Sequence, residues 1–339
     1  MKAWRLHTGG KLIKQRLEPL SPPNGFVKVK LLYAALSKTD AMLLKGNAKP
    51  SFLPITIGHQ AVGIVGEVGE GVTNVERGDR VVLDPYVYCL ECAELKDAKC
   101  SECAELKTYG VHQDGFMSDF VTIACNNVYK LPERVSSEEA LFSSHVAFAI
   151  NIFNKLQIKP GEHVLVYGAS VVGIILAQIA LYYQAIPILV DMRDERLEIA
   201  ESSGIYYCIN SIKEDVKERI FTVTGGSMPT VVAYFPSSDN ALNKCLDYAT
   251  SGARICISSW SGADINLTGS FDAVLKKQLS VFGVSNGAKL IAPAINMLAN
   301  KTVDVTNAIS GVIAFDEVSR VLAEQIKHPD KNIKLLVKF

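Results

Sequence analysis

The chain has 339 residues, of which 48% are hydrophobic and 21% charged, proportions that suit a globular protein of two domains. Lysine plus arginine equals aspartate plus glutamate at 35 each, so we expect no nucleic-acid partner. The longest apolar stretch, residues 173–190, contains two glutamines and a proline, so it predicts a buried helix and strand and no membrane span.

The first part of the chain consists of short β-forming segments separated by glycine-bearing turns. Between about residues 26 and 131, strands are expected at Phe26–Tyr33, Ala61–Val68, Arg80–Leu83 and Phe120–Ile123. So many short strands predict an irregular β-barrel. No charged and apolar leader opens the chain at Met1, which favours a cytoplasmic location.

Four cysteines lie close together inside this β-rich part, as Cys89-x2-Cys92-x7-Cys100-x2-Cys103. Two CxxC turns at this spacing can place four thiolates around Zn²⁺, so we predict one structural zinc per chain on Cys89, Cys92, Cys100 and Cys103. With every position filled by sulfur, no position remains for water or substrate. Two disulfides or a redox CxxC stay open as alternatives, although a reducing cytosol disfavours disulfides.

From about residue 162 the pattern changes to strands that alternate with helix-length segments. The expected strands are His163–Tyr167, Ile186–Val190, Tyr206–Ile209, Thr230–Tyr234, Arg254–Ser258 and Leu279–Val284. Six strands in βαβ units predict a parallel sheet, so the fold class is α/β. The chain then ends in a helical stretch, Glu317–Lys327, and a strand, Ile333–Lys338.

The first strand of this second part leads through a glycine-containing turn directly into an apolar helix, the context that a dinucleotide fingerprint requires. Asp191 closes the second strand, where a carboxylate can bind the adenosine ribose hydroxyls and favour NAD, with NADP less favoured. Arg193 could still attract a 2′-phosphate. The expected cofactor-binding residues are Gly168, Ser170, Val171, Val172, Gly173, Asp191 and Arg193. A doubly wound sheet that binds no nucleotide stays open, because Ser170 replaces the second glycine.

Further motifs resemble the zinc-type alcohol dehydrogenases of the medium-chain dehydrogenase family. They are Gly58-His59-Gln60-Ala61-Val62-Gly63 with Gly66, Gly71-Val72-Thr73, Gly78-Asp79-Arg80-Val81, and Asp114-Gly115-Phe116 with Phe120-Val121. The resemblance implies a GroES-like catalytic domain at residues 1–146 and 286–339, with the zinc lobe at about 86–107. A Rossmann NAD-binding domain, a doubly wound parallel sheet, is implied at 147–285. Cys100 is taken as the zinc ligand in place of Leu95, where the family has its third lobe cysteine.

The catalytic zinc ligands of this family are mostly absent. The resemblance implies a cysteine at the first residue of Ser37-Lys38-Thr39-Asp40, the histidine of Gly58-His59-Gln60, and a cysteine or carboxylate at Ser143. Only His59 survives, and a serine hydroxyl is a poor zinc ligand. Gln60 also replaces a near-metal glutamate, so three anionic groups are missing together. A rebuilt metal site shared by His59 and His145 stays open.

Hydride transfer does not itself need zinc, since the nicotinamide delivers hydride and the protein stabilises the oxygen that gains charge. We therefore expect Thr39, Ser37, Ser143 and His59 to be the catalytic residues, with Thr39 at the family position that starts a proton relay. Lys334 is counted among the cofactor-binding residues. It stands where the family carries an arginine that pairs with Asp40.

These features predict an NAD(H)-dependent oxidoreductase acting on a small alcohol, carbonyl or activated alkene, with the structural zinc kept and the catalytic zinc lost. One alternative is a nucleotide-binding homologue without turnover, such as a sensor or assembly subunit. Another is a zinc alcohol dehydrogenase with unusual ligands. A homodimer or homotetramer is expected, with Leu279–Val284 as a pairing edge.

Overall fold

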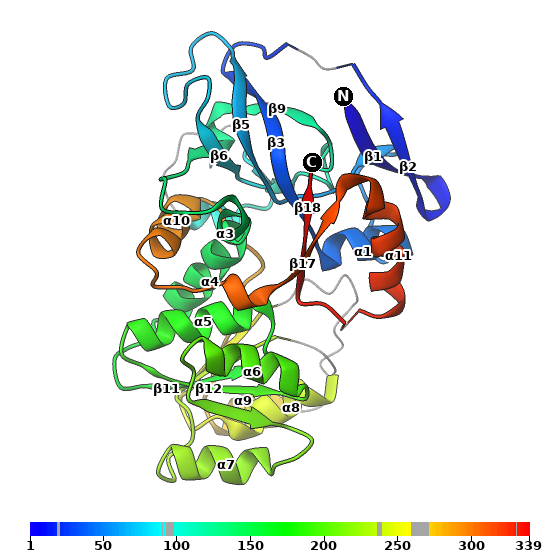
Figure 1. Cartoon of the computed structure of the whole chain (residues 1–339). Helices are drawn as coiled ribbons and strands as arrows, with labels where there is room; N and C mark the ends of the chain where they lie inside the picture. The colour runs from blue at the N-terminus through cyan, green and yellow to red at the C-terminus, as the bar shows by residue number, and fades with distance from the viewer. Residues whose placement is uncertain (19–20, 90, 93–97, 236–238, 259–270, 330) are drawn as a thin grey trace. The chain divides into compact units, whose positions relative to one another are not determined.

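The computed structural model describes residues 1–18, 21–89, 91–92, 98–235, 239–258, 271–329 and 331–339. It divides the chain into two compact units (Figure 1). Unit 1 comprises Met1–Ser144, Ile291–Ala299 and Ala308–Phe339, and unit 2 comprises His145–Leu290 and Asn300–Asn307. The domain boundaries given above stay a prediction.

The main sheet of unit 1 has the strand order β10-β6-β5-β3-β18-β17, and β9 also pairs with β3. The strands are β3 (Phe26–Leu36), β5 (Ala61–Val68), β6 (Arg80–Leu83), β9 (Phe120–Ala124), β10 (Val128–Lys130), β17 (Ile309–Ala314) and β18 (Lys334–Lys338). Val27, Val29 and Leu31 of β3 are buried at alternate positions, because successive side chains of a strand point to opposite faces. The C-terminal strand β18 thereby brings Lys334 into the N-terminal sheet.

Two small sheets complete the β structure of unit 1. One has the order β2-β1-β4, with β1 (Lys2–His7), β2 (Lys11–Arg16) and β4 (Ile55–Thr56), and the other pairs β7 (Tyr86–Val87) with β8 (Lys107–Thr108). The α-helices are α1 (Lys38–Lys45), α3 (Ser137–Ala140), α10 (Ile291–Ala299) and α11 (Val318–Lys327), and the 3₁₀ turns are η1 (Thr8–Gly10), η2 (Ala98–Glu102), η3 (Cys125–Asn127) and η5 (Phe315–Glu317). A further 3₁₀ turn, η4 (Thr306–Ala308), starts in unit 2 and ends in unit 1. Figure 1 shows α1 beside α11, two helices far apart in the chain.

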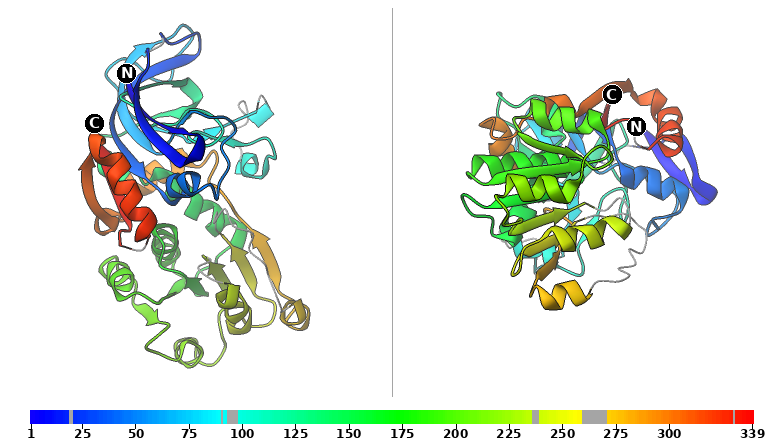
Figure 2. Two further views of the ribbon diagram at one scale, coloured as in Figure 1. Left: turned by 90° about the vertical axis from the view of Figure 1, so that its right-hand side faces the viewer. Right: turned by 90° about the horizontal axis from the view of Figure 1, so that it is seen from below.

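Unit 2 contains a six-stranded parallel sheet in the order β13-β12-β11-β14-β15-β16. Its strands are β11 (His163–Tyr167), β12 (Ile186–Asp191), β13 (Tyr207–Asn210), β14 (Val231–Tyr234), β15 (Arg254–Ile257) and β16 (Ser280–Gly283). The helices are α4 (Ser143–Leu156), which starts in unit 1, α5 (Val171–Tyr182), α6 (Asp194–Ser202), α7 (Val216–Val223), α8 (Asp239–Tyr248) and α9 (Phe271–Lys276). Figure 2 shows helices on both faces of this sheet.

This strand order reverses between β11 and β14, where the chain crosses from one half of the sheet to the other. In open parallel sheets, ligands bind at the carboxyl ends of the strands beside such a reversal. Alternate residues of the strands, such as Leu165, Ile188 and Val232, form one core with α7 and α8. The fold class expected from the sequence, a GroES-like β-rich part plus a Rossmann parallel sheet, is confirmed.

Several elements were not expected from the sequence, among them β1, β2, β4, β10, α1, β17 and α10. Strand β17 carries Gly311 and only every second residue is partly buried, so its apolar signal is weak. Helix α10 contains Pro293 in its first turn, where proline is tolerated but usually suggests a break. None of the described helices combines the length and the apolar composition that a membrane crossing needs.

Candidate functional site

Ser37 is the N-cap of helix α1, because the sequence Ser37-Lys38-Thr39-Asp40 forms a capping box. The Ser37 hydroxyl accepts from the Asp40 amide N at 3.2 Å, and both the Ser37 hydroxyl and the Ser37 N–H donate to Asp40 Oδ2, at 2.6 and 2.9 Å. The proton of this hydroxyl is therefore already used within the cap. Thr39 lies in the first turn of α1 and is partly buried.

Asp40 joins this cap to the segment that carries His59. Its carboxylate is 1% exposed, and Oδ1 accepts from the Gly58 amide N at 3.0 Å. Burial lowers the pKa of the half-buried His59; Asp40 opposes that shift and Lys334 adds to it. His59 is consequently a neutral imidazole near pH 7.

Gln60 and Lys334 are both buried and contact each other. The ammonium Nζ of Lys334 donates to Gln60 Oε1, and Gln60 Nε2 in turn lies 2.6 Å from the hydroxyl of Ser144. Burial lowers the pKa of Lys334 to about 8, while Asp40 acts in the opposite direction. No ion pair between described residues joins Lys334 to Asp40, so the pairing that we expected is replaced by the amide of Gln60.

Ser143 is the first residue of α4 and is fully buried. Its hydroxyl has no hydrogen-bond partner among the described residues. A buried hydroxyl without a partner costs about 1–3 kcal/mol. We call Ser37, Asp40, His59, Gln60, Ser143, Ser144 and Lys334 together the polar centre; all belong to unit 1.

The donor set of the polar centre does not fit a zinc ion. Zinc in proteins takes thiolates, imidazoles or carboxylates. Here Ser37 and Ser143 offer neutral hydroxyls, Asp40 is engaged by three donors, and His59 is left as the one good ligand. Within the described ranges, three or more His, Cys, Asp or Glu side chains lie close enough together to hold a metal only in a group of cysteines, which is separate from the polar centre.

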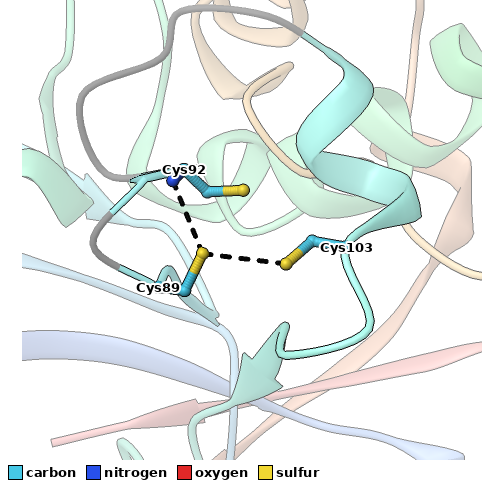
Figure 3. Close-up of side chains that lie close together, drawn as sticks. All are labelled: Cys89, Cys92 and Cys103. Atoms are coloured by element: carbon cyan, nitrogen blue, oxygen red, sulfur yellow. Dashed lines mark hydrogen bonds between the residues drawn. The ribbon is translucent and has the colours of Figure 1, made fainter.

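That group is the cysteine lobe, in which the Sγ atoms of Cys89, Cys92 and Cys103 all lie within 4.8 Å of one another (Figure 3). Cys89 Sγ is 3.8 Å from Cys103 Sγ and accepts from the Cys92 amide at 3.5 Å. All eight cysteines of the chain, each a described residue, are free thiols. Three of the four expected ligands therefore gather where a tetrahedral zinc could bind.

Cys100, the fourth expected ligand, stands apart from this group. It is 1% exposed, and its thiol lies 3.7 Å from the carbonyl oxygen of Cys92. Leu95, the position where the family has its cysteine, lies outside the described residues. The assignment of Cys100 as the fourth ligand stays a prediction.

The dinucleotide fingerprint in unit 2 lies between β11 and α5. Gly168 has φ +113°, and a Cβ on Gly173 would lie 2.3 Å from the Gly168 carbonyl oxygen, so strand and helix approach too closely for a side chain. Ser170 is the N-cap of α5 and accepts from the Gly173 amide at 3.1 Å. Helix capping thus explains why a serine stands at position 170 in place of the second glycine. Val171 and Val172 follow it in the first helical turn.

Asp191 ends β12 and its carboxylate is buried. It accepts from the Ala169 amide at 2.8 Å and from the Arg193 amide and Nε, each at 3.1 Å. Burial tends to raise the pKa of Asp191, but Arg193 and the backbone amides outweigh it and hold that pKa below its usual value. Arg193 therefore neutralises the carboxylate that was expected to take the ribose.

The structure joins Ser37 to Asp40, and Asp40 to the backbone amide of Gly58, the residue before His59. Lys334 belongs to unit 1 and the fingerprint with which we had grouped it belongs to unit 2, so its role in cofactor binding stays a prediction. Sequence reasoning missed Ser144, the hydrogen-bond partner of Gln60. The available signal was a second serine directly after Ser143 at a helix start. Whether these residues are catalytic stays a prediction.

Two family models match the chain. Residues 23–133 match the alcohol dehydrogenase GroES-like domain, and residues 171–300 match the zinc-binding dehydrogenases. A zinc-type alcohol dehydrogenase-like protein of Haemophilus influenzae is 29% identical over 344 residues, covering 96% of this chain and 100% of the relative. The starvation-sensing protein RspB of Escherichia coli K12 is 28% identical over 325 residues, covering 95% of each chain.

A solved structure extends this similarity to the whole fold. The protein described as the short chain alcohol dehydrogenase rspB of E. coli CFT073, in complex with NADH, matches with a TM-score of 0.87 at 28% identity, covering 100% of this chain and 99% of its own. By its two family models, its relatives and its fold, the chain belongs to the zinc-type alcohol dehydrogenases of the medium-chain dehydrogenase family and is an alcohol dehydrogenase-like oxidoreductase.

Proposed function

We propose that this protein is an NAD(H)-dependent oxidoreductase that keeps a structural zinc and works without a catalytic one. Its substrate is a small alcohol, carbonyl or activated alkene. One observation carries the proposal: the buried Lys334 ammonium is held by the neutral Gln60 amide, which contacts Ser144, the residue after Ser143, where a metal ligand would be needed. Asp40 and Lys334 already balance each other's charge there, so a dication would add two uncompensated positive charges.

The bound nicotinamide supplies the hydride, and the chain supplies cofactor binding and the hydrogen-bond donors. The turn at Gly168 and the close strand-helix packing at Gly173 match the first and third glycines of a dinucleotide fingerprint, and the N-terminus of α5 can bind a pyrophosphate, so these residues fit a dinucleotide. In the polar centre, neutral donors must stabilise the oxygen that gains negative charge. We assign this role to the hydroxyls of Ser143 and Ser144, with His59 as a neutral group of the same centre.

The structural zinc is assigned to Cys89, Cys92 and Cys103, with Cys100 as the fourth thiolate. Three convergent sulfurs support this site, and a closed tetrathiolate would stabilise the lobe without taking part in the reaction. We also propose a homodimer or homotetramer. Strand β16 is the outermost strand of the unit 2 sheet, and Val281 on it is 41% exposed, which favours pairing through this edge.

Two measurements test the proposal together. Elemental analysis of the purified protein is expected to give close to one zinc per chain, and close to two would overturn the loss of the catalytic metal. Spectrophotometric assays of NADH oxidation over a panel of small aldehydes, ketones, quinones and enones are expected to find turnover. Tight NADH binding with no turnover of any member would refute the enzyme assignment.

A second candidate function is nucleotide sensing without turnover. The similarity to RspB, whose name describes starvation sensing, favours it, as does the match to the rspB structure that holds NADH. The same panel separates the two functions, because a sensor would bind NADH in the low micromolar range or tighter and turn over nothing.

A further inference from the structure

The hydrogen bonds from Lys334 to Ser144 run in one fixed direction. An ammonium has three donors and no acceptor, so the atom of Gln60 that faces Lys334 must be the carbonyl oxygen Oε1. The amide nitrogen Nε2 therefore faces Ser144 and donates to its Oγ at 2.6 Å. Turning the amide around would place two donors against each other. Lys334 thus determines which way the side chain of Gln60 points.

This direction determines what the hydroxyl of Ser144 can do. Its oxygen accepts from Gln60, so its own proton is left to donate to another atom. Among the described residues, Ser144 Oγ has this one hydrogen bond. Ser37 differs, because its proton goes to Asp40 at 2.6 Å. The hydroxyl of Ser144, which ends the hydrogen bonds that start at Lys334, is therefore ready to donate.

We propose that Ser144 is the hydrogen-bond donor for the substrate oxygen that gains negative charge, and that Lys334 and Gln60 are the positioning residues that hold it in this role. The proposal rests on the zinc-independent oxidoreductase function proposed above. Adjacent Ser143, whose buried hydroxyl lacks a partner among the described residues, marks the same helix start as a place where an oxygen ligand would be accepted.

The buried ammonium of Lys334 strengthens the two hydrogen bonds that lead through Gln60 to Ser144. Hydrogen bonds in series polarise one another, and in a buried site a positive charge at one end makes the far donor stronger. The groups that act electrostatically on Lys334 are Asp40 on α1, which favours the ammonium, and His59, which is neutral near pH 7. The charge of Lys334 is therefore available at pH 7 without a metal.

The pH dependence follows from this charge. Lys334 has a pKa of about 8 because it is buried, so it is charged below this pH and loses its proton as pH rises through it. Neutral lysine no longer polarises the amide strongly. We expect the turnover number to fall as pH rises through about 8. An arginine at this position stays charged throughout, so K334R is expected to remove that fall.

The experiment compares S144A, K334R and K334M with the wild type, using the best substrate from the carbonyl panel and saturating NADH. The exposed serine and lysine controls are S51A and K11M. Loss of a donor to a developing oxyanion lowers kcat by about 10²-fold. We expect this loss for S144A and K334M, with KM and the NADH Kd changed less than twofold, and we expect K334R to keep at least half of kcat at pH 7.

Two results would overturn the proposal while leaving the oxidoreductase function intact. One is kcat of S144A within twofold of the wild type. The other is an alkaline fall in K334R identical to that of the wild type. Absence of turnover for the wild type over the whole panel would instead refute both the function and this inference. If K334M does not fold, S144A and K334R still decide, because both keep a positive charge at position 334.

Discussion

The unpartnered hydroxyl of Ser143 allows a sharp test of the polar centre through stability. Replacing Ser143 with alanine removes a fully buried polar atom that has no partner among the described residues. Since such an atom costs about 1–3 kcal/mol in the folded state, we expect S143A to raise the free energy of unfolding by about 1 kcal/mol. The small void left by the oxygen offsets part of this gain.

Ser118 is the matched control for this change. It is a buried serine of unit 1, 2% exposed, whose hydroxyl donates to the carbonyl oxygen of Phe120 at 2.7 Å. S118A leaves that carbonyl without its donor, so we expect it to lower the free energy of unfolding by about 1 kcal/mol. The two variants remove the same atom and are expected to differ by about 2 kcal/mol.

The assay is urea unfolding of both variants followed by circular dichroism, with midpoint and slope compared to the wild type. A higher midpoint for S143A together with lower turnover is the expected pair of results, because a costly hydroxyl is kept only where it contacts a ligand. If S143A loses as much stability as S118A, the Ser143 hydroxyl has a partner such as a bound metal or water, and the reasoning is refuted.

Three further predictions concern the cofactor and the structural zinc. G173A places a Cβ 2.3 Å from the Gly168 carbonyl oxygen, so we expect at least tenfold weaker NADH binding by nicotinamide fluorescence, and unchanged binding would contradict the fingerprint assignment. R193A frees the carboxylate of Asp191, so the Kd ratio of NADPH to NADH is expected to rise at least tenfold; a constant ratio would show that Arg193 has no part in selectivity. C103S is expected to lose the zinc and several kcal/mol of stability, whereas C208S keeps both, and equal zinc content in the two variants would refute the lobe assignment.

The parallel sheet could be predicted from the sequence because each of its strands is a short apolar run followed by a helix-length segment. Buried strands such as β11 and β12 carry this signal in most of their residues, since all but the first residue of each is buried. Half-exposed β17 does not, and neither does proline-containing α10, so both were missed. Their positions depend on tertiary packing against β18 and α3.

The replacement of cysteine by serine at two zinc-ligand positions of the family is visible in the sequence, because a serine differs chemically from a cysteine wherever it lies; the loss of the metal stays a prediction. The partners of the buried groups could not. The contact between Lys334 and Gln60 joins residues separated by 274 positions, and no local pattern links them. Likewise, the Arg193 side chain donates to the carboxylate of Asp191 in a rotamer that the sequence does not specify. The direction of the hydrogen bonds from Lys334 through Gln60, which leaves the Ser144 hydroxyl free to donate, depends on the three-dimensional structure and cannot be inferred from the sequence.

The most direct test of the whole account is a crystal structure of the NADH complex with anomalous data collected on both sides of the zinc edge. We predict one strong anomalous peak per chain among Cys89, Cys92 and Cys103, and none beside His59. A fully occupied peak beside His59 would contradict a centre that works through Lys334 and serine hydroxyls.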